Sequence, residues 1–97
     1  MKREQLLNAL NVMLREKKSV LLIERKSGSG IRLLKELYNI DFLCVPRMAK
    51  KTPTEQAKIW KIIINNPRAV VLIVQRGDNL RNPALTNKMV HLAEDGA

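Results

Sequence analysis

The sequence predicts an α/β fold in which short parallel strands alternate with helices. Three observations favour it: short aliphatic runs recur along the chain, amphipathic segments at helical spacing separate them, and glycine or proline breaks mark the junctions. Strands that alternate with helices form a parallel sheet, because each crossover places a helix on one face. We therefore expect one domain over residues 1–97 with the order α-β-α-β-α-β-α, a three-stranded sheet in the order 2-1-3, and helices on both faces.

The first half of the chain supplies two helices and two strands. Leucines recur at helical spacing over residues 3–16, and the run Val20–Ile23 is apolar at every position, as in a strand covered on both faces. Gly28-Ser29-Gly30 separates that run from a second amphipathic helix, predicted over 30–38. A second strand is expected over Asp41–Val45, where the following proline closes it.

The second half contains the clearest helix start. In Thr52-Pro53-Thr54-Glu55, threonine suits the N-cap, proline the first helical position and glutamate the reciprocal acceptor of a capping box. That helix is expected to run until Asn65-Asn66-Pro67 stops it, and Ala69–Val74 is predicted as the third and most buried strand. Asn82-Pro83 repeats the same start before a fourth helix. The apolar stripe of this fourth helix contains Leu85, Met89, Leu92 and Ala93.

The composition restricts the classes of function. The chain carries 18 lysines and arginines against 9 acids, a formal charge of +9, which favours a polyanionic partner, nucleic acid first. The apolar runs fall far short of the ~18 residues of a membrane span, and the first residues lack the pattern of a secretory signal. The single cysteine, Cys44, forms no internal disulfide, so we expect a reducing, cytoplasmic environment and no membrane partner.

Basic residues concentrate in the three segments that follow the predicted strands. Because parallel strands end at the same sheet edge, these segments meet there, together with helix N-termini, whose free N–H groups attract anions. The three segments hold seven cations and two acids, while the opposite edge holds Lys17, Lys18 and Arg68. We expect phosphates to bind the side chains of Arg25, Lys26, Arg47, Lys50, Lys51, Arg76 and Arg81, assisted by the backbone N–H groups of Ser29 and Gly30.

Some residues of chemical interest also have an ordinary structural interpretation. Gly28 and Gly30 fit a tight strand-to-helix turn as well as a phosphate cradle, and both interpretations stay open. Trp60 lies on an apolar helix stripe and is expected in the core, whereas His91 faces away from the stripe of the last helix and is expected at the surface. Cys44, in mid-strand among apolar neighbours, is expected to be a buried, unreactive thiol.

The segment Val20–Leu34 resembles the strand, loop and helix of a P-loop ATPase of the AAA+ type, and Val70–Leu80 is similar to the Walker B strand of that family and the residues after it. In that family a lysine and a hydroxyl after the last glycine bind phosphates and magnesium. Here Ile31-Arg32 stands in those positions, and Gln75-Arg76 stands in place of the Walker B acids. The resemblance therefore implies a non-hydrolysing relative.

A second resemblance concerns metal-dependent nucleases. A strand that ends in Glu24, two crossovers and a third strand leading to Asp78 are similar in outline to a Toprim domain, and Ile23-Glu24-Arg25-Lys26 is similar to a strand of phage terminase nucleases. The resemblance implies that these acids hold magnesium for phosphodiester cleavage. The Toprim pattern has an Asp-x-Asp after the third strand, where this chain offers Asp78 alone, and magnesium requires several oxygen ligands.

Binding rather than catalysis is the function class that the sequence favours. His91 is the only histidine, so no Ser/His/Asp or Cys/His arrangement is visible, and no cofactor or metal is expected. The leading prediction is a non-catalytic module, cytoplasmic or virally encoded, that binds the nucleic-acid backbone. The alternatives are a protein-interaction adaptor or oligomerising remnant of an AAA+ ATPase, with dimerisation through an open sheet edge, and a magnesium-dependent nuclease that uses Glu24 and Asp78.

Overall fold

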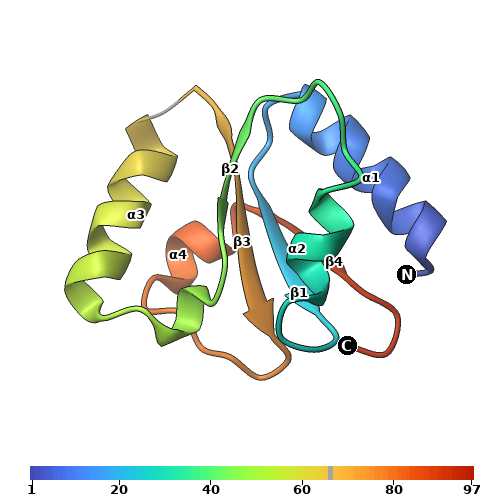
Figure 1. The fold of residues 1–97 in the computed structure, drawn as a ribbon. Coiled ribbons are helices and arrows are strands. Elements are labelled where there is room, and N and C mark those ends of the chain that lie inside the picture. Colours follow the sequence, from blue (N-terminus) through green and yellow to red (C-terminus); the bar gives the residue numbers. More distant parts are fainter. Residues whose placement is uncertain (66) are drawn as a thin grey trace.

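A parallel sheet of four strands lies between two layers of helices in the part of the chain that the computed structural model describes, residues 1–65 and 67–97 (Figure 1). The expected α/β class, with a parallel sheet, is therefore confirmed. None of the described helices is long and apolar enough to cross a lipid bilayer. The elements are α1 (Arg3–Arg15), β1 (Val20–Glu24), α2 (Ser29–Leu34), β2 (Phe42–Val45), the 3-10 helix η1 (Met48–Lys50), α3 (Pro53–Asn65), β3 (Ala69–Gln75), α4 (Pro83–Thr86) and β4 (Val90–Ala93).

The strand order is β2-β3-β1-β4, so the expected three-stranded sheet of order 2-1-3 is wrong. β3 lies between β1 and β2, with Val20 opposite Val71 on one side and Phe42 opposite Ala69 on the other. β3 is a long run of buried apolar residues, and a place between two strands removes more of its surface from water than an edge would. A fourth strand then occupies the other side of β1.

This fourth strand replaces most of the predicted last helix. α4 begins where expected, because the Asn82 side chain accepts a backbone hydrogen bond in its first turn, but the helix ends at Thr86. Residues Val90–Ala93 form β4 instead, and a hydrogen bond from Val90 N to Ser19 O adds to its pairing with β1. The free edge of β1 offers these residues backbone partners. That tertiary pairing outweighs a helical spacing of apolar side chains.

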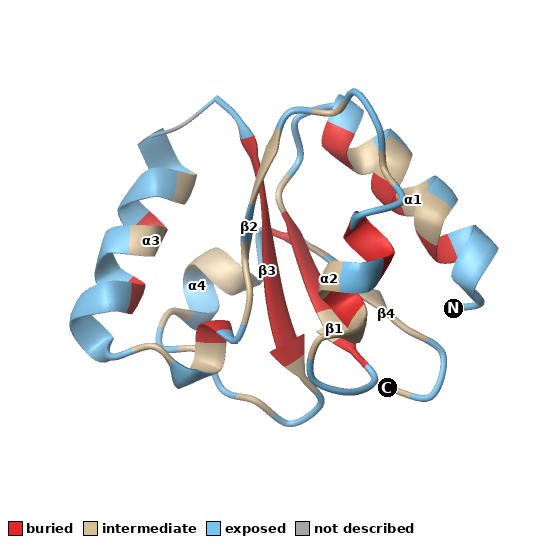
Figure 2. Ribbon diagram, in the orientation of Figure 1, coloured by how far each residue is buried: buried red, intermediate tan, exposed pale blue. Residues whose placement is uncertain are grey.

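Two hydrophobic clusters fill the two faces of the sheet (Figure 2). α1 and α2 cover one face, and α3 and α4 cover the other (Figure 1). Successive residues of β1 and β3 enter opposite clusters, which is why both strands are apolar at every core position. Trp60 is 5% exposed, so its expected place in the core is confirmed. The first cluster is Leu6, Leu10, Leu14, Val20, Leu22, Leu33, Leu34, Ala69, Val71 and Ile73, and the second is Leu21, Met48, Trp60, Val70, Leu72, Val74 and Met89.

Helix starts follow the sequence signals more closely than helix ends do. The capping box before α3 is confirmed, since Glu55 N donates to Thr52 Oγ1 at 3.2 Å and Thr52 N donates to the Glu55 carboxylate at 3.1 Å. α2, in contrast, ends at Leu34 rather than at residue 38, and Tyr38 is 75% exposed. The expected stop of α3 includes Asn66, which lies outside the described residues.

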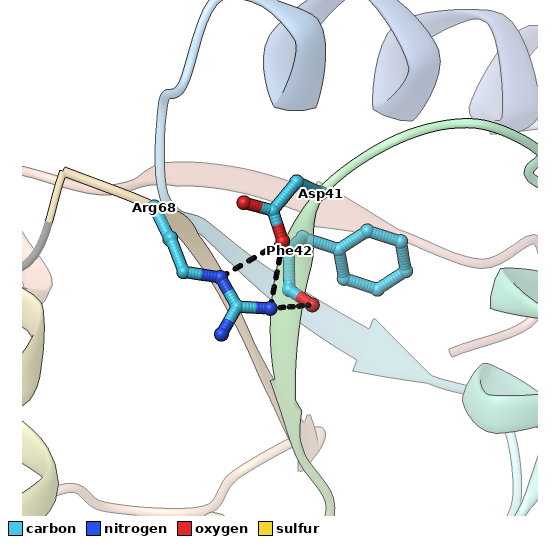
Figure 3. A network of polar contacts seen from close by, with 3 residues as sticks. All are labelled: Asp41, Phe42 and Arg68. Carbon is cyan, nitrogen blue, oxygen red and sulfur yellow. Dashed lines mark hydrogen bonds and ion pairs between the residues drawn. The ribbon is translucent and has the colours of Figure 1, made fainter.

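An arginine fastens the start of β2 to the start of β3 (Figure 3). Arg68 Nε donates to Asp41 Oδ1 at 2.8 Å, and Arg68 Nη2 lies 2.7 Å from the same oxygen. Nη2 also donates to the carbonyl oxygen of Phe42 at 3.5 Å. Since β2 is short and lies at the edge of the sheet, this contact helps to fix the point at which the strand begins.

Candidate functional site

The carboxyl ends of β1, β2 and β3 meet around a cavity of about 470 Å³, called the carboxyl-edge cavity below. A smaller cavity of about 290 Å³ adjoins it, with Glu24, Ser27 and Arg47 in common, and is also lined by Lys51. The fold therefore brings the three strand exits together at one edge of the sheet. The polar lining of the carboxyl-edge cavity comes from all three exits: Glu24 and Ser27, Arg47 and Lys50, and Gln75 and Asp78.

Glu24, the last residue of β1, closes the glycine-rich turn from within. The residue is 4% exposed. Its Oε1 accepts hydrogen bonds from the N–H groups of Gly28 and Gly30, both at 3.1 Å, and its Oε2 accepts one from Gln75 Nε2 at 2.9 Å. Gly28 has a φ of 92°, which glycine adopts without strain. The carboxylate thus takes the place that an external anion would need, and the geometry favours the tight-turn interpretation of the two glycines.

The rest of this turn is also bound internally. Ser29 N donates to Lys26 O at 3.0 Å, and Ser29 Oγ lies 2.8 Å from Lys26 O. Glu94 Oε1 contacts the same hydroxyl and accepts a hydrogen bond from Arg25 N at 3.2 Å. The backbone N–H groups of Ser29 and Gly30, which the sequence predicts to bind phosphate, therefore both donate within the fold.

The loop after β2 behaves differently and presents Arg47, Lys50 and Lys51 to the two cavities. Met48 in η1 is fully buried and anchors this loop in the second hydrophobic cluster. Gln56 Nε2 donates to Lys51 O at 3.4 Å and holds the far end of the loop. Within residues 1–65 and 67–97, the three cationic side chains form no ion pair and no hydrogen bond. Their charges are therefore available to a ligand.

The other cations expected to bind phosphate do not line the carboxyl-edge cavity. Two of them, Arg25 and Lys26, line a separate cavity of about 540 Å³, whose other charged residues are Arg3, Arg32, Glu36, Glu94 and Asp95. Arg81 lines a groove of about 320 Å³ beside α3, and Arg76 is exposed in the turn after β3. The structure therefore gathers three of the seven expected cations around the carboxyl-edge cavity and its smaller neighbour and distributes the other four beside them.

The two acids of the nuclease interpretation, Glu24 and Asp78, line the same cavity, but internal donors already bind both. Asp78 Oδ2 accepts a hydrogen bond from Gln75 N at 2.8 Å and closes the turn after β3. In the described part of the chain, no three acidic, histidine or cysteine side chains come together as a metal site. Magnesium would need further oxygen ligands from water or from a substrate.

Comparison with protein-family models, curated proteins and solved structures finds no match for this chain. The resemblances to P-loop ATPases, Toprim domains and terminase nucleases therefore stay predictions. Two features of this edge bear on function: the N–H groups of the turn after β1 are bound internally, and the cations of the loop after β2 form no ion pair within the described residues.

The sequence does not single out two residues that organise this edge, Gln75 and Glu94. In the sequence, Gln75 stands out only because it replaces a Walker B acid, yet it donates hydrogen bonds to both Glu24 and Asp78. Glu94 falls in the predicted last helix, whereas it follows β4 and binds the turn after β1. Recognising a strand in Val90–Ala93 would have placed Glu94 at the same sheet edge as the other strand exits.

Cys44 is exposed, so the prediction of a buried thiol is wrong. The reason is that β2 is an edge strand whose residues are only half-buried or exposed. Partial desolvation raises the pKa of the Cys44 thiol, and the negative charge of Glu24 raises it further. His91 is exposed as expected, although it lies on β4, where its Nε2 is 2.8 Å from Thr86 O.

Proposed function

We propose that this protein binds the sugar-phosphate backbone of nucleic acid at the carboxyl edge of its sheet. The observation that carries the proposal is the group Arg47, Lys50 and Lys51, which lines two adjoining cavities and forms no ion pair within the described residues. Uncommitted cations beside a concave surface attract phosphates, and the counterions that they displace from nucleic acid add to the affinity. The net charge of +9 supports the same partner.

The remaining basic residues of this edge extend the surface over several phosphates. They are exposed, and in the described part of the chain their side chains carry no ion pair. The N–H groups of Ser29 and Gly30 take no part in the proposal, because internal acceptors use them. The extending residues are Arg25, Lys26, Arg76 and Arg81.

We expect the backbone, rather than the bases, to be recognised. Base stacking requires exposed aromatic rings at the binding surface. Trp60 is buried, and Phe42 packs against the first hydrophobic cluster. Tyr38 is exposed, but it precedes β2 at the amino edge, where its carbonyl accepts a hydrogen bond from Arg15. A duplex should therefore bind at least as well as a single strand of equal charge, with little dependence on base sequence.

Fluorescence anisotropy with labelled duplex and single-stranded oligonucleotides, measured over a range of salt concentrations, tests the proposal. The triple variant Arg47→Gln/Lys50→Gln/Lys51→Gln is compared with Lys17→Gln/Lys18→Gln/Lys88→Gln, whose residues are exposed and precede the amino ends of β1 and β4. Both variants lose the same charge. We expect the first to bind at least tenfold more weakly and to lower the slope of log K against log salt by about 2.7, since each lost phosphate contact removes about 0.9.

The control triple should keep most of the wild-type affinity and slope. Equal losses in the two triples would show that net charge alone drives binding, and the assignment to this edge would be wrong. Absence of binding by the wild type at low salt would refute the proposed function altogether. Circular dichroism of each variant confirms that the fold is retained before the affinities are compared.

A magnesium-dependent nuclease is the second candidate, because Glu24 and Asp78 line one cavity. To act in this way, the two acids would have to exchange their internal donors for a metal ion. Incubating supercoiled plasmid with Mg²⁺ or Mn²⁺ tests this. Nicking by the wild type that disappears in Asp78→Asn would establish the nuclease, whereas intact plasmid would leave binding as the function of the edge.

A further inference from the structure

A groove of about 320 Å³ lies between α3 and the start of α4, the two helices that cover the second face of the sheet (Figure 1). Among the described residues, the groove shares no lining residue with the carboxyl-edge cavity, so it is a separate candidate site. The lining residues from α3 are three to four positions apart and therefore share one helix face. They are Pro53, Ala57, Trp60, Lys61 and Ile64, and the opposite wall contains Arg81, Asn82 and Leu85.

Hydrogen bonds fix the two walls of this groove relative to each other. Gln56 of α3, which also lines the groove, is 2% exposed, and its Oε1 accepts a hydrogen bond from Arg81 N at 3.3 Å. At the start of α4, Asn82 Oδ1 accepts a hydrogen bond from Leu85 N at 3.2 Å. The groove is therefore already formed, and a ligand would not have to order its walls on binding.

The packing of the core does not use all of the groups that line the groove. Ile59 and Ile63 of α3 pack against the second hydrophobic cluster, whereas Ile64 is 60% exposed. Trp60 is buried, but its Nε1 has no hydrogen-bond partner within residues 1–65 and 67–97. Buried polar groups normally have such a partner. An exposed apolar side chain and a donor without an acceptor, both on one groove, indicate a site for a ligand.

The charges of the groove indicate what kind of ligand it takes. Lys61 on α3 and Arg81 on the opposite wall are exposed, and in the described part of the chain their side chains form no ion pair and no hydrogen bond. None of the described residues that line the groove is acidic. Hydrogen bonds from such cations to a carboxylate are stronger than those between neutral groups. The lining therefore favours a ligand that combines an apolar body with an anionic group.

We propose that this groove binds a small carboxylic acid with an aliphatic or aromatic body. The body lies against Trp60, Ile64 and Leu85, and the carboxylate pairs with Lys61 and Arg81. The volume of the groove is near the lower end of the range for small-molecule sites, about 300 Å³. A helix of a partner protein, about 10 Å in diameter, is too wide to enter it. Arg81 also belongs to the proposed phosphate surface, so the groove is tested without nucleic acid and does not depend on nucleic-acid binding.

NMR titration of isotope-labelled protein with octanoate, octanol and acetate tests the proposal. Trp60 is the only tryptophan, so its indole N–H gives a single signal that reports on the groove. Octanol lacks the charge of octanoate, and acetate lacks its apolar body. We expect octanoate to shift the indole signal to saturation with about fivefold higher affinity than octanol, as exposed ion pairs contribute. Acetate should cause little shift at the same concentrations.

Two double variants with equal loss of charge locate the carboxylate. Lys61→Gln/Arg81→Gln should lower the affinity for octanoate to that for octanol. Lys58→Gln/Arg76→Gln removes two exposed cations that do not line the groove and should bind octanoate as the wild type does. Ile64→Ser, at an exposed position, should weaken the binding of octanoate and octanol alike. Circular dichroism checks that each variant remains folded.

Three results would overturn the proposal: an indole signal that octanoate does not shift, an affinity for octanoate no higher than that for octanol, or equal losses in the two double variants. A helical peptide of leucine and glutamate residues is titrated in parallel. If this peptide shifts the indole signal and octanoate does not, the groove serves a partner protein, and its assignment to a small acid is wrong.

Discussion

The segments that follow β1 and β2 meet at the same sheet edge but use their polar groups in opposite ways. The turn after β1 contains two glycines, and the sequence predicts that its N–H groups bind phosphate. In the fold, however, Glu24 and Glu94 accept hydrogen bonds from polar groups of this turn. The loop after β2 ends in no glycine motif, yet buried Met48 holds its cations at the surface without partners. A glycine-rich turn therefore indicates an anion site only when no neighbouring carboxylate already fills it.

The largest effect is expected at Glu24. Glu24→Ala would leave three donors without their acceptor in a buried place, at a cost of about 1 to 3 kcal/mol for each buried group left unpaired. We expect the free energy of unfolding to fall by on the order of 3 kcal/mol, because some donors can reach water after rearrangement. Urea denaturation followed by circular dichroism measures it. Glu4→Ala, an exposed site in the first turn of α1, is the control and should change stability little.

Glu24→Gln refines this test, since glutamine keeps the shape of the side chain but has one acceptor oxygen. Its loss of stability should lie between those of the wild type and Glu24→Ala. If both variants unfold at the wild-type urea concentration, the carboxylate does not hold the turn, and the contrast between the two loops disappears.

A smaller effect separates the cations of the two loops. Arg47→Gln/Lys50→Gln should weaken nucleic-acid binding several-fold more than Arg25→Gln/Lys26→Gln, although each variant loses two charges. The physical reason is that Arg47 and Lys50 line the cavity where the three strand exits meet, whereas Arg25 and Lys26 line a separate cavity. Anisotropy titrations at one salt concentration measure the two losses. Equal losses would mean that a place in the carboxyl-edge cavity does not distinguish the two pairs of cations.

The elements that the sequence predicts correctly depend on neighbours along the chain. β1 and β3 are found because the runs Val20–Ile23 and Ala69–Val74 within them are apolar at every position. The starts of α3 and α4 are found because the capping residues lie within one turn of the helices that they cap. These signals need no knowledge of what packs against them. The meeting of the three strand exits at one edge is likewise predicted, because a parallel sheet places the ends of its strands together.

The elements that the sequence predicts wrongly depend on distant partners. Val90–Ala93 has apolar residues that suit a helix or a strand, and the vacant side of β1 decides in favour of a strand. Cys44 is exposed because β2 became an edge, which the apolar run around it does not reveal. Glu24 looks the same in sequence whether it faces a ligand or the glycines beside it. Its role is set by the fold of the turn.

A weaker effect concerns the end of the β2 loop, where Thr52 and Glu55 cap α3. The N–H of Thr52 lowers the pKa of the Glu55 carboxyl, and the Thr52 side chain lowers it further. The capping contribution is therefore present above the unfolded-state pKa and is lost as the pH falls through the lowered pKa of the folded state. Thr52→Ala keeps the backbone bond, so the pKa of Glu55 should rise part of the way to its usual value in an NMR titration. Thr54→Ala, in the same turn, should leave it unchanged.

The smallest effect links the two loops through the charge of Glu24. Glu24 ends β1 and Cys44 lies on β2, with β3 between the two strands, yet the carboxylate raises the pKa of the thiol. Desolvation raises it more, so Glu24→Gln should lower this pKa in part and speed the reaction of Cys44 with a disulfide reagent about two- to threefold at neutral pH. Asp78→Asn, which alters the other acid of the cavity, should leave the rate unchanged. If Asp78→Asn speeds the reaction as much as Glu24→Gln does, the charge of the whole edge controls the thiol, and the internally bound Glu24 carboxylate has no special influence across the sheet.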